Sequence, residues 1–278
     1  MVKAQQRRRS KPPAKKFVDS AARDALRYLG DQAEPPVDLF ALACMRAVKK
    51  IHLRPMVGEG ATYAVNGGFE IAVRDSARNE IIRLDLDDPR RPPLAPRQRF
   101  TLAHEIAHTL YYDLNGRRPV LINDTPRGDT LEALCNHAAG MFLLPDAPLL
   151  ADLAGRAVSL DALRWLSKRY RASSSAVIRR IDELGVGKPD DHAVISAEIR
   201  ADGVDIVAAF IPASMQVVLP RPKPYVTAFH TWGRAFVTNE FWLSDLWRRE
   251  VDVYGMRLCV EKRASGNAGG FHLEISAI

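Results

Sequence analysis

The sequence lacks any apolar stretch long enough to cross a membrane. In 278 residues, no uninterrupted apolar run comes near the roughly 18 residues that a spanning helix needs. Cysteine is also scarce: Cys44, Cys135 and Cys259 are far apart and odd in number, so a disulfide framework is not expected. The basic N-terminus lacks a following apolar region, which argues against a signal peptide. We therefore expect a cytoplasmic protein with no membrane partner.

Acidic residues are absent from the first 16 residues. This segment holds seven of the 40 lysines and arginines, and the remaining 33 basic residues balance the 33 acidic ones, so the net charge of +7 arises here. Residues 1–17 are predicted to form a disordered basic tail. Contact with nucleic acid through this tail is conceivable, but a solubilising role without a partner is the favoured interpretation.

The hydrophobic pattern divides the rest of the chain into two parts. Residues 18–186 combine helical periodicity with a few short strands, whereas residues 192–278 show the alternating pattern of strands. The turn-forming segment 185–191 separates them. We expect an α+β domain that includes a helical pair at 160–185, followed by a β-rich C-terminal domain of unassigned role.

Some elements of the first domain have clear sequence boundaries. Asp38 is expected to cap a helix that runs to Lys50, and a hairpin is expected to turn at residues 66–68. Pro96 is expected to begin a helix that ends at residues 115–116.

The stretch RFTLAHEIAHTLYYD, residues 99–113, carries the clearest chemical signal. Residues four apart in an α-helix are offset by about 40° and about 6 Å along the axis, so His104 and His108 share one face. Glu105 lies about 100° from His104, where its carboxylate can reach a water on a bound ion. This pattern is typical of zinc peptidases, with two histidine ligands and one general base. The helix can be buried because one side is apolar, at Leu102, Ile106 and Leu110.

A catalytic zinc needs a third protein ligand and one open position. Glu132 lies on an otherwise apolar segment, with Asn136 one turn further along the same face. A buried carboxylate needs a partner, and a metal ion would provide one. Cys135 is expected to be a small buried hydrophobe and not a redox group. Spacing alone leaves rival ligands open, namely Asp113, Asp124, Asp129 and His137.

Two segments resemble the ImmA/IrrE family of metallopeptidases. They are RQRFTLAHEIAHTLYYD and, starting 24 residues past the second histidine, EALCNHAAGMFLLP. The similarity extends over about residues 20–185 and implies a zincin-like metallopeptidase domain. By this resemblance the metal ligands are His104, His108 and Glu132, the catalytic base is Glu105, and Asn136 lies beside the site. His137 and Gly140 depart from the usual family residues and affect local packing. The family implies cleavage or inactivation of helix-turn-helix repressors, which releases stress or mobile-element genes.

The leading hypothesis is therefore a zinc-dependent endopeptidase acting on a regulatory protein, with manganese as an alternative ion. Tyr111, Tyr112 and His137 are the nearest candidates in sequence for donating to the oxyanion. The alternative is a non-hydrolytic metal-binding regulator that sequesters a repressor or binds DNA. Glu105 favours the enzyme, because a binding protein has no need of a general base.

The helical pair at 160–185 could instead read DNA as a helix-turn-helix. Its apolar positions favour a pair that closes a core, because positive charge without a pattern of base contacts is weak support for DNA binding. The cations concerned are Lys168, Arg169, Arg171, Arg179 and Arg180.

Overall fold

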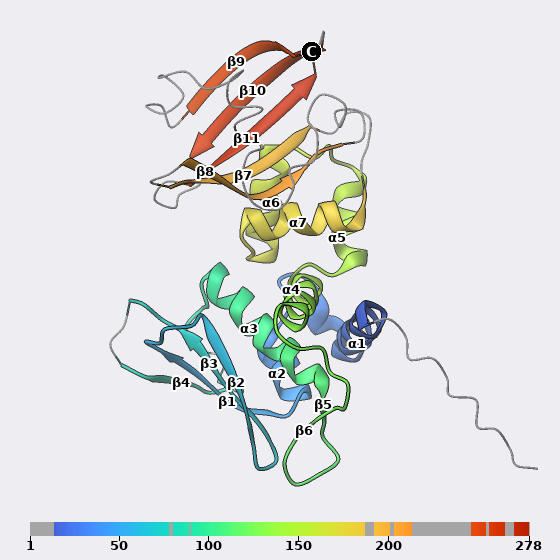
Figure 1. Ribbon diagram of the computed structural model, residues 1–278, viewed down its shortest axis with the longest axis vertical. Helices are drawn as coiled ribbons and strands as arrows, with labels where there is room; N and C mark the ends of the chain where they lie inside the picture. The colour runs from blue at the N-terminus through green and yellow to red at the C-terminus, as the bar shows by residue number, and fades with distance from the viewer. Residues whose placement is uncertain are drawn as a thin grey trace, which may run out of the picture. The chain divides into compact units, whose positions relative to one another are not determined.

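Two compact units make up the described part of the chain. The computed structural model describes residues 14–77, 80–88, 90–186, 192–200, 203–212, 246–253, 256–264 and 270–277. The first unit contains residues up to 94 and residues 98–142, and the second contains residues 95–97 and the chain from 143 onward. Figure 1 shows the helices and strands of each. Within the described ranges, every helix is too short or too polar to span a membrane.

A four-stranded mixed sheet with the order β2-β3-β1-β4 forms the frame of the first unit. β1 pairs with β3 in parallel, whereas β2 and β4 pair with their neighbours in antiparallel fashion. The predicted hairpin joins β2 to β3, with Gly67 at a φ of 78° in its turn. The strands are β1 (Val48–Arg54), β2 (Gly60–Val65), β3 (Gly68–Arg74) and β4 (Ile82–Leu84), and a separate pair comprises β5 (Tyr112–Asp113) and β6 (Val120–Leu121).

Helix α1 (Ala14–Leu29) begins inside the expected disordered tail. The prediction of disorder is therefore wrong for residues 14–17, because an amphipathic helix already starts there. Val18 is fully buried, and the ring of Phe17 lies 5.8 Å from that of Tyr111 between centroids. Residues 1–13 lie outside the described residues. A short 3-10 helix, Gly30–Ala33, follows α1.

Helix α2 (Leu39–Met45) begins where the sequence predicts. The Asp38 carboxylate accepts hydrogen bonds from the backbone N–H groups of Phe40 and Ala41, at 2.9 and 3.2 Å. The predicted end at Lys50 is wrong, because Ala47 adopts a left-handed φ of 57° and the chain then enters β1.

Helix α3 (Pro96–His108) starts at the predicted proline but ends earlier than expected. A 3-10 turn, Thr109–Tyr111, and strand β5 follow at once. Arg46 stabilises this turn, because its guanidinium donates to Thr109 Oγ1 at 3.1 Å and to the Thr109 carbonyl at 2.7 Å. Helix α4 (Asp129–Leu143) follows strands β5 and β6.

The second unit combines a five-stranded antiparallel sheet with three helices. The strand order is β8-β7-β11-β10-β9. Its helices are α5 (Asp146–Ala154), α6 (Leu160–Tyr170) and α7 (Ser174–Leu184). Its strands are β7 (Ala193–Arg200), β8 (Gly203–Phe210), β9 (Leu246–Val253), β10 (Met256–Ala264) and β11 (Gly270–Ala277). Helix α5 was not anticipated from the sequence.

Polar contacts connect the helical pair α6–α7 to this sheet. Arg179 donates to the Val207 carbonyl at 2.7 Å, and Glu274 accepts from the backbone N–H of Leu160 at 2.8 Å. The helical pair therefore shares one compact unit with the strands that follow it. The division expected from the sequence, at residues 185–191, falls inside this unit.

Candidate metal centre

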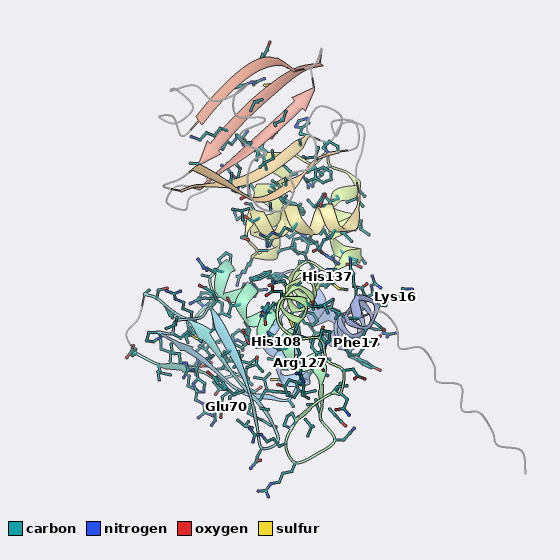
Figure 2. The ribbon with its side chains drawn as sticks, viewed as in Figure 1. Lys16, Phe17, Glu70, His108, Arg127 and His137 are labelled. Carbon is teal, nitrogen blue, oxygen red and sulfur yellow. The ribbon has the colours of Figure 1, made fainter. Side chains whose placement is uncertain are left out.

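Helix α3 presents the two histidines from a largely buried scaffold. Leu102, Ala103, Ile106 and Ala107 are fully buried, so the helix is held firmly in the first unit. His104 and His108 are half-buried, and their rings meet edge to face with centroids 4.8 Å apart. The sequence prediction that they share one face is confirmed by this contact. Figure 2 labels His108 on α3.

Helix α4 brings Glu132 to this pair. The Nε2 atoms of His104 and His108 are 3.1 Å apart. Glu132 Oε2 lies 3.1 Å from His104 Nε2, and Glu132 Oε1 lies 3.6 Å from His108 Nε2. Three electron-pair donors from two helices thus converge on one point. Half of the Glu132 side chain is exposed, so the expectation of a buried carboxylate is wrong and the group opens to solvent.

Neighbouring residues of α4 contact the other nitrogen of each imidazole. Asn136 Oδ1 lies 2.9 Å from His104 Nδ1, and Cys135 Sγ lies 3.5 Å from His108 Nδ1. An amide oxygen only accepts, so the contact with Asn136 favours the tautomer that has its proton on Nδ1, and that tautomer leaves the Nε2 lone pair available to a metal ion. Burial lowers the pKa of His108, and the neighbouring His104 lowers it further. The negative charge of Glu132 acts in the opposite direction. A neutral imidazole with a free lone pair is the form that binds a metal ion.

Glu105 completes the cluster from the buried side of α3. Its carboxylate and the two histidines place their candidate donor atoms within 4.8 Å of one another. No other group of three or more histidine, cysteine or acidic residues with metal-binding spacing occurs in the described ranges. Thr62 donates to Glu105 Oε2 at 2.7 Å. Burial raises the pKa of Glu105, with the hydrogen bond from Thr62 opposing that shift.

The two carboxylates therefore have different environments. Glu105 is 6% exposed and is hydrogen-bonded to the sheet, whereas Glu132 faces the imidazole nitrogens directly. This difference suits a base and a ligand respectively. The rival ligands proposed from spacing are placed elsewhere: Asp113, Asp124 and Asp129 are exposed and belong to no such cluster of described residues.

The three residues suggested as oxyanion donors have other environments. Tyr111 is buried, and its hydroxyl has no hydrogen-bond partner among the described residues. Tyr112 packs edge-on against Phe69, with ring centroids 5.2 Å apart. His137, which Figure 2 labels on α4, pairs with Asp19 of α1 at 2.7 Å. The role of these residues as oxyanion donors stays a prediction.

Sequence reasoning missed Thr62 and Gly60, both on β2. Thr62 contacts Glu105 through a hydroxyl, and a Cβ added at Gly60 would lie 2.6 Å from Glu105 Oε1. No local signal identifies either residue, because a contact across 43 positions depends on how the sheet packs against α3.

Several cations of the proposed DNA-reading segment are already engaged within the second unit. Arg169 pairs with Asp152 at 2.6 Å, and the Arg179 guanidinium donates to β8. The Arg180 side chain is 4% exposed and pairs with Asp146 and Glu183. These contacts favour the core interpretation of α6 and α7 over a DNA-binding surface.

Comparison with known proteins identifies the segment that carries this cluster. Residues 89–182 match the family described as the IrrE N-terminal-like domain. The radiation response metalloprotease IrrE of Deinococcus radiodurans is 39% identical over 94 residues. That alignment covers 31% of this chain and 27% of the relative, so the chain matches about a quarter of the relative's length. The matching family segment contains both histidines, Glu105, Glu132 and Asn136.

A solved structure resembles nearly the whole chain in fold alone. A transcriptional regulator of Mycobacterium tuberculosis is 13% identical, with a TM-score of 0.50. The likeness covers 95% of this chain and 90% of that one. At this level of identity the comparison carries no statement about activity or partners.

Proposed function

We propose, from the premise that residues 89–182 form an ImmA/IrrE-family metallopeptidase domain, that this chain is a zinc-dependent endopeptidase. The single observation that carries the proposal is the convergence of His104 Nε2, His108 Nε2 and a Glu132 oxygen, with Glu105 beside them. A metal-binding regulator could use the first three groups. The buried fourth carboxylate favours the enzyme, because hydrolysis needs a general base and metal binding alone does not.

The donor atoms fit the coordination that zinc prefers. A tetrahedral zinc ion with bonds of about 2.0–2.1 Å requires ligand atoms about 3.3 Å apart. His104 Nε2 lies 3.1 Å from His108 Nε2 and 3.1 Å from Glu132 Oε2, and the other oxygen of that carboxylate, Oε1, lies 3.6 Å from His108 Nε2. Two imidazole nitrogens and one carboxylate oxygen are also the donor set of many catalytic zinc sites, and manganese accepts the same ligands less readily.

Bound zinc supplies two things to peptide hydrolysis: it activates a water molecule as nucleophile, and it polarises the substrate carbonyl. The protein then moves the proton. Glu105 is the proposed general base, which takes the proton of the attacking water and returns it to the leaving amine. Because burial raises the pKa of Glu105, the carboxyl is better suited to hold and release a proton near neutral pH.

His104 and His108 would bind the ion through Nε2. Asn136 and Cys135 favour the tautomer that this requires, because they contact the Nδ1 atoms. Asn136 is the stronger partner, because an amide oxygen accepts a hydrogen bond better than a thiol sulfur does. The exposed side of Glu132 leaves room for an extended substrate segment to approach.

The proposed substrate is a helix-turn-helix transcriptional repressor whose loss releases stress-response genes. Support comes from the family resemblance and from the name of the matched relative, a radiation response metalloprotease. We place the reaction in a reducing cytoplasm, because Cys44, Cys135 and Cys259 are all free thiols.

Glu105→Gln tests the proposal. The variant keeps the size of the side chain but cannot accept the proton, so metal content should be unchanged while proteolysis stops. Co-expression with any helix-turn-helix protein encoded beside the gene should give a cleavage product that a chelator abolishes. A variant that still cuts at the wild-type rate would remove Glu105 from the mechanism. Stoichiometric metal without any cleavage by the wild type would instead support a non-hydrolytic regulator.

A further inference from the structure

Strand β2 contacts Glu105 through a single hydroxyl group. Thr62 Oγ1 lies 2.7 Å from Glu105 Oε2 and 2.9 Å from the backbone carbonyl oxygen of Glu105. One threonine therefore reaches both the side chain and the main chain of the same residue. The hydroxyl has one hydrogen for these two acceptors, and the shorter contact, to Oε2, restricts the position of that carboxyl oxygen.

Gly60 provides the space into which the same carboxylate fits. A Cβ at this position would lie 2.6 Å from Glu105 Oε1, 2.7 Å from Thr101 Cγ2 and 2.9 Å from Glu105 Cγ. Real Cβ atoms do not approach so closely, so any larger residue would displace the Glu105 side chain. Residues two apart on a strand face the same side, and Gly60 and Thr62 therefore form one surface against α3.

Neighbouring Tyr63 points to the opposite face of β2. Its hydroxyl accepts a hydrogen bond from Arg54 at 2.9 Å, and its side chain is exposed. The strand thus has one face that supports Glu105 and another that does not touch it.

We propose that β2 positions the general base: Thr62 fixes one carboxylate oxygen of Glu105, and Gly60 keeps open the space that the other oxygen occupies. This inference rests on the proposed peptidase function and adds two positioning residues to it. Both lie outside residues 89–182, the segment that matches the family. The physical role is preorganisation, because a base that is misplaced by about 1 Å can lose about 100-fold in rate.

The first test compares Thr62→Val and Thr62→Ser with Tyr63→Phe in the full-length, zinc-loaded protein. The probe is a proteome-derived peptide library read by mass spectrometry, followed by kinetics on a synthetic copy of the fastest-cut peptide. Thr62→Val should lower kcat about 10- to 100-fold, with KM and zinc content unchanged, because only the placement of the base is lost. Thr62→Ser keeps the hydroxyl and should restore most of kcat. Tyr63→Phe, which removes a hydroxyl from the other face of the same strand, should match the wild type.

A double-mutant cycle tests the contact without any substrate. Thr62→Val, Glu105→Ala and the double variant are unfolded in urea with zinc bound. If Thr62 holds Glu105, the urea midpoint of the double variant shifts by less than the sum of the two single shifts. The reason is that each single variant already removes the contact between the two residues. Additive shifts overturn the proposal.

The two tests also separate this inference from the proposed function. A kcat that Thr62→Val leaves unchanged overturns the positioning role even where the cycle shows coupling. If the wild type cuts neither a library peptide nor a co-expressed helix-turn-helix protein, the peptidase proposal fails, and the cycle alone then decides whether β2 holds Glu105.

Discussion

Asn136 of α4 accepts a hydrogen bond from His104 of α3, with 2.9 Å between Oδ1 and Nδ1. The bond connects the two helices on which the candidate ligands lie. It also selects the tautomer in which His104 Nε2 has a free lone pair, facing His108 and Glu132. Partners of this kind orient metal-binding imidazoles and make them more basic.

Replacing Asn136 with alanine should therefore weaken metal binding without removing any ligand. We expect about a 10- to 100-fold loss of zinc affinity, the usual effect of deleting such a partner. Competition with a chromogenic chelator measures it. Asn136→Asp keeps an acceptor at the same position and should bind zinc at least as well as the wild type. Equal affinities for the alanine variant and the wild type would show that the hydrogen bond has no role in metal binding.

Removing the metal should lower the thermal stability of the first unit. An ion that binds the folded state adds free energy of unfolding by mass action, about 2.7 kcal/mol at a concentration 100 times Kd. A chelator should lower Tm, and added zinc should restore it, as followed by differential scanning calorimetry. Glu132→Ala should reduce the rise in Tm that zinc causes, because one ligand is gone. His108→Ala should reduce that rise further. If the chelator does not change the Tm of the wild type, no ion is bound at this cluster.

The buried cation of α7 supports a separate prediction about the second unit. Arg180 is 4% exposed, pairs with Asp146 and Glu183, and donates to the Leu144 carbonyl at 3.3 Å. Arg180→Met removes the guanidinium that connects these acceptors and should lower the free energy of unfolding by about 1–3 kcal/mol. Urea denaturation measures this loss, with the exposed Arg164→Met as the matched control. A loss of affinity for DNA at unchanged stability would instead make Arg180 a nucleic-acid contact.

The local part of the centre was predictable, and the part that depends on tertiary packing was not. Spacing within one helix is enough to place His104 and His108 on a common face. The position of Glu132 depends on the path of the chain from 114 to 128, which no local rule determines, so only the family resemblance selected it. Thr62 lies 43 positions before Glu105 and could not be found without the sheet.

The difference between local signals and tertiary packing also explains which helix boundaries were predicted correctly. Asp38 and Pro96 determine where α2 and α3 start, because capping and the proline ring act within one turn. The end of α3 depends on Arg46, which is 63 positions away from its partner Thr109. Contacts of that range leave no periodic signal in the sequence.

Cys135 should be far less reactive than Cys44 in the folded protein. Cys135 is fully buried against His108, and burial, followed by the charges of Glu132 and Glu105, raises the pKa of its thiol. Cys44 is exposed, although partial burial and Asp87 raise its pKa as well. Alkylating reagents attack the thiolate, and a raised pKa keeps the thiolate fraction small until the pH rises above that value.

Brief treatment with iodoacetamide at pH 8, followed by peptide mass mapping, should therefore label Cys44 and leave Cys135 unmodified. Labelling of Cys135 should appear only in urea, where the unfolded thiol returns to its ordinary pKa and becomes accessible. A Cys44→Ser variant checks that loss of the exposed site does not redirect the reagent. Equal labelling of the two cysteines in native protein would mean that the thiol beside His108 is accessible and ionised. That result would contradict a merely supporting role for Cys135 and make its sulfur a competing metal ligand.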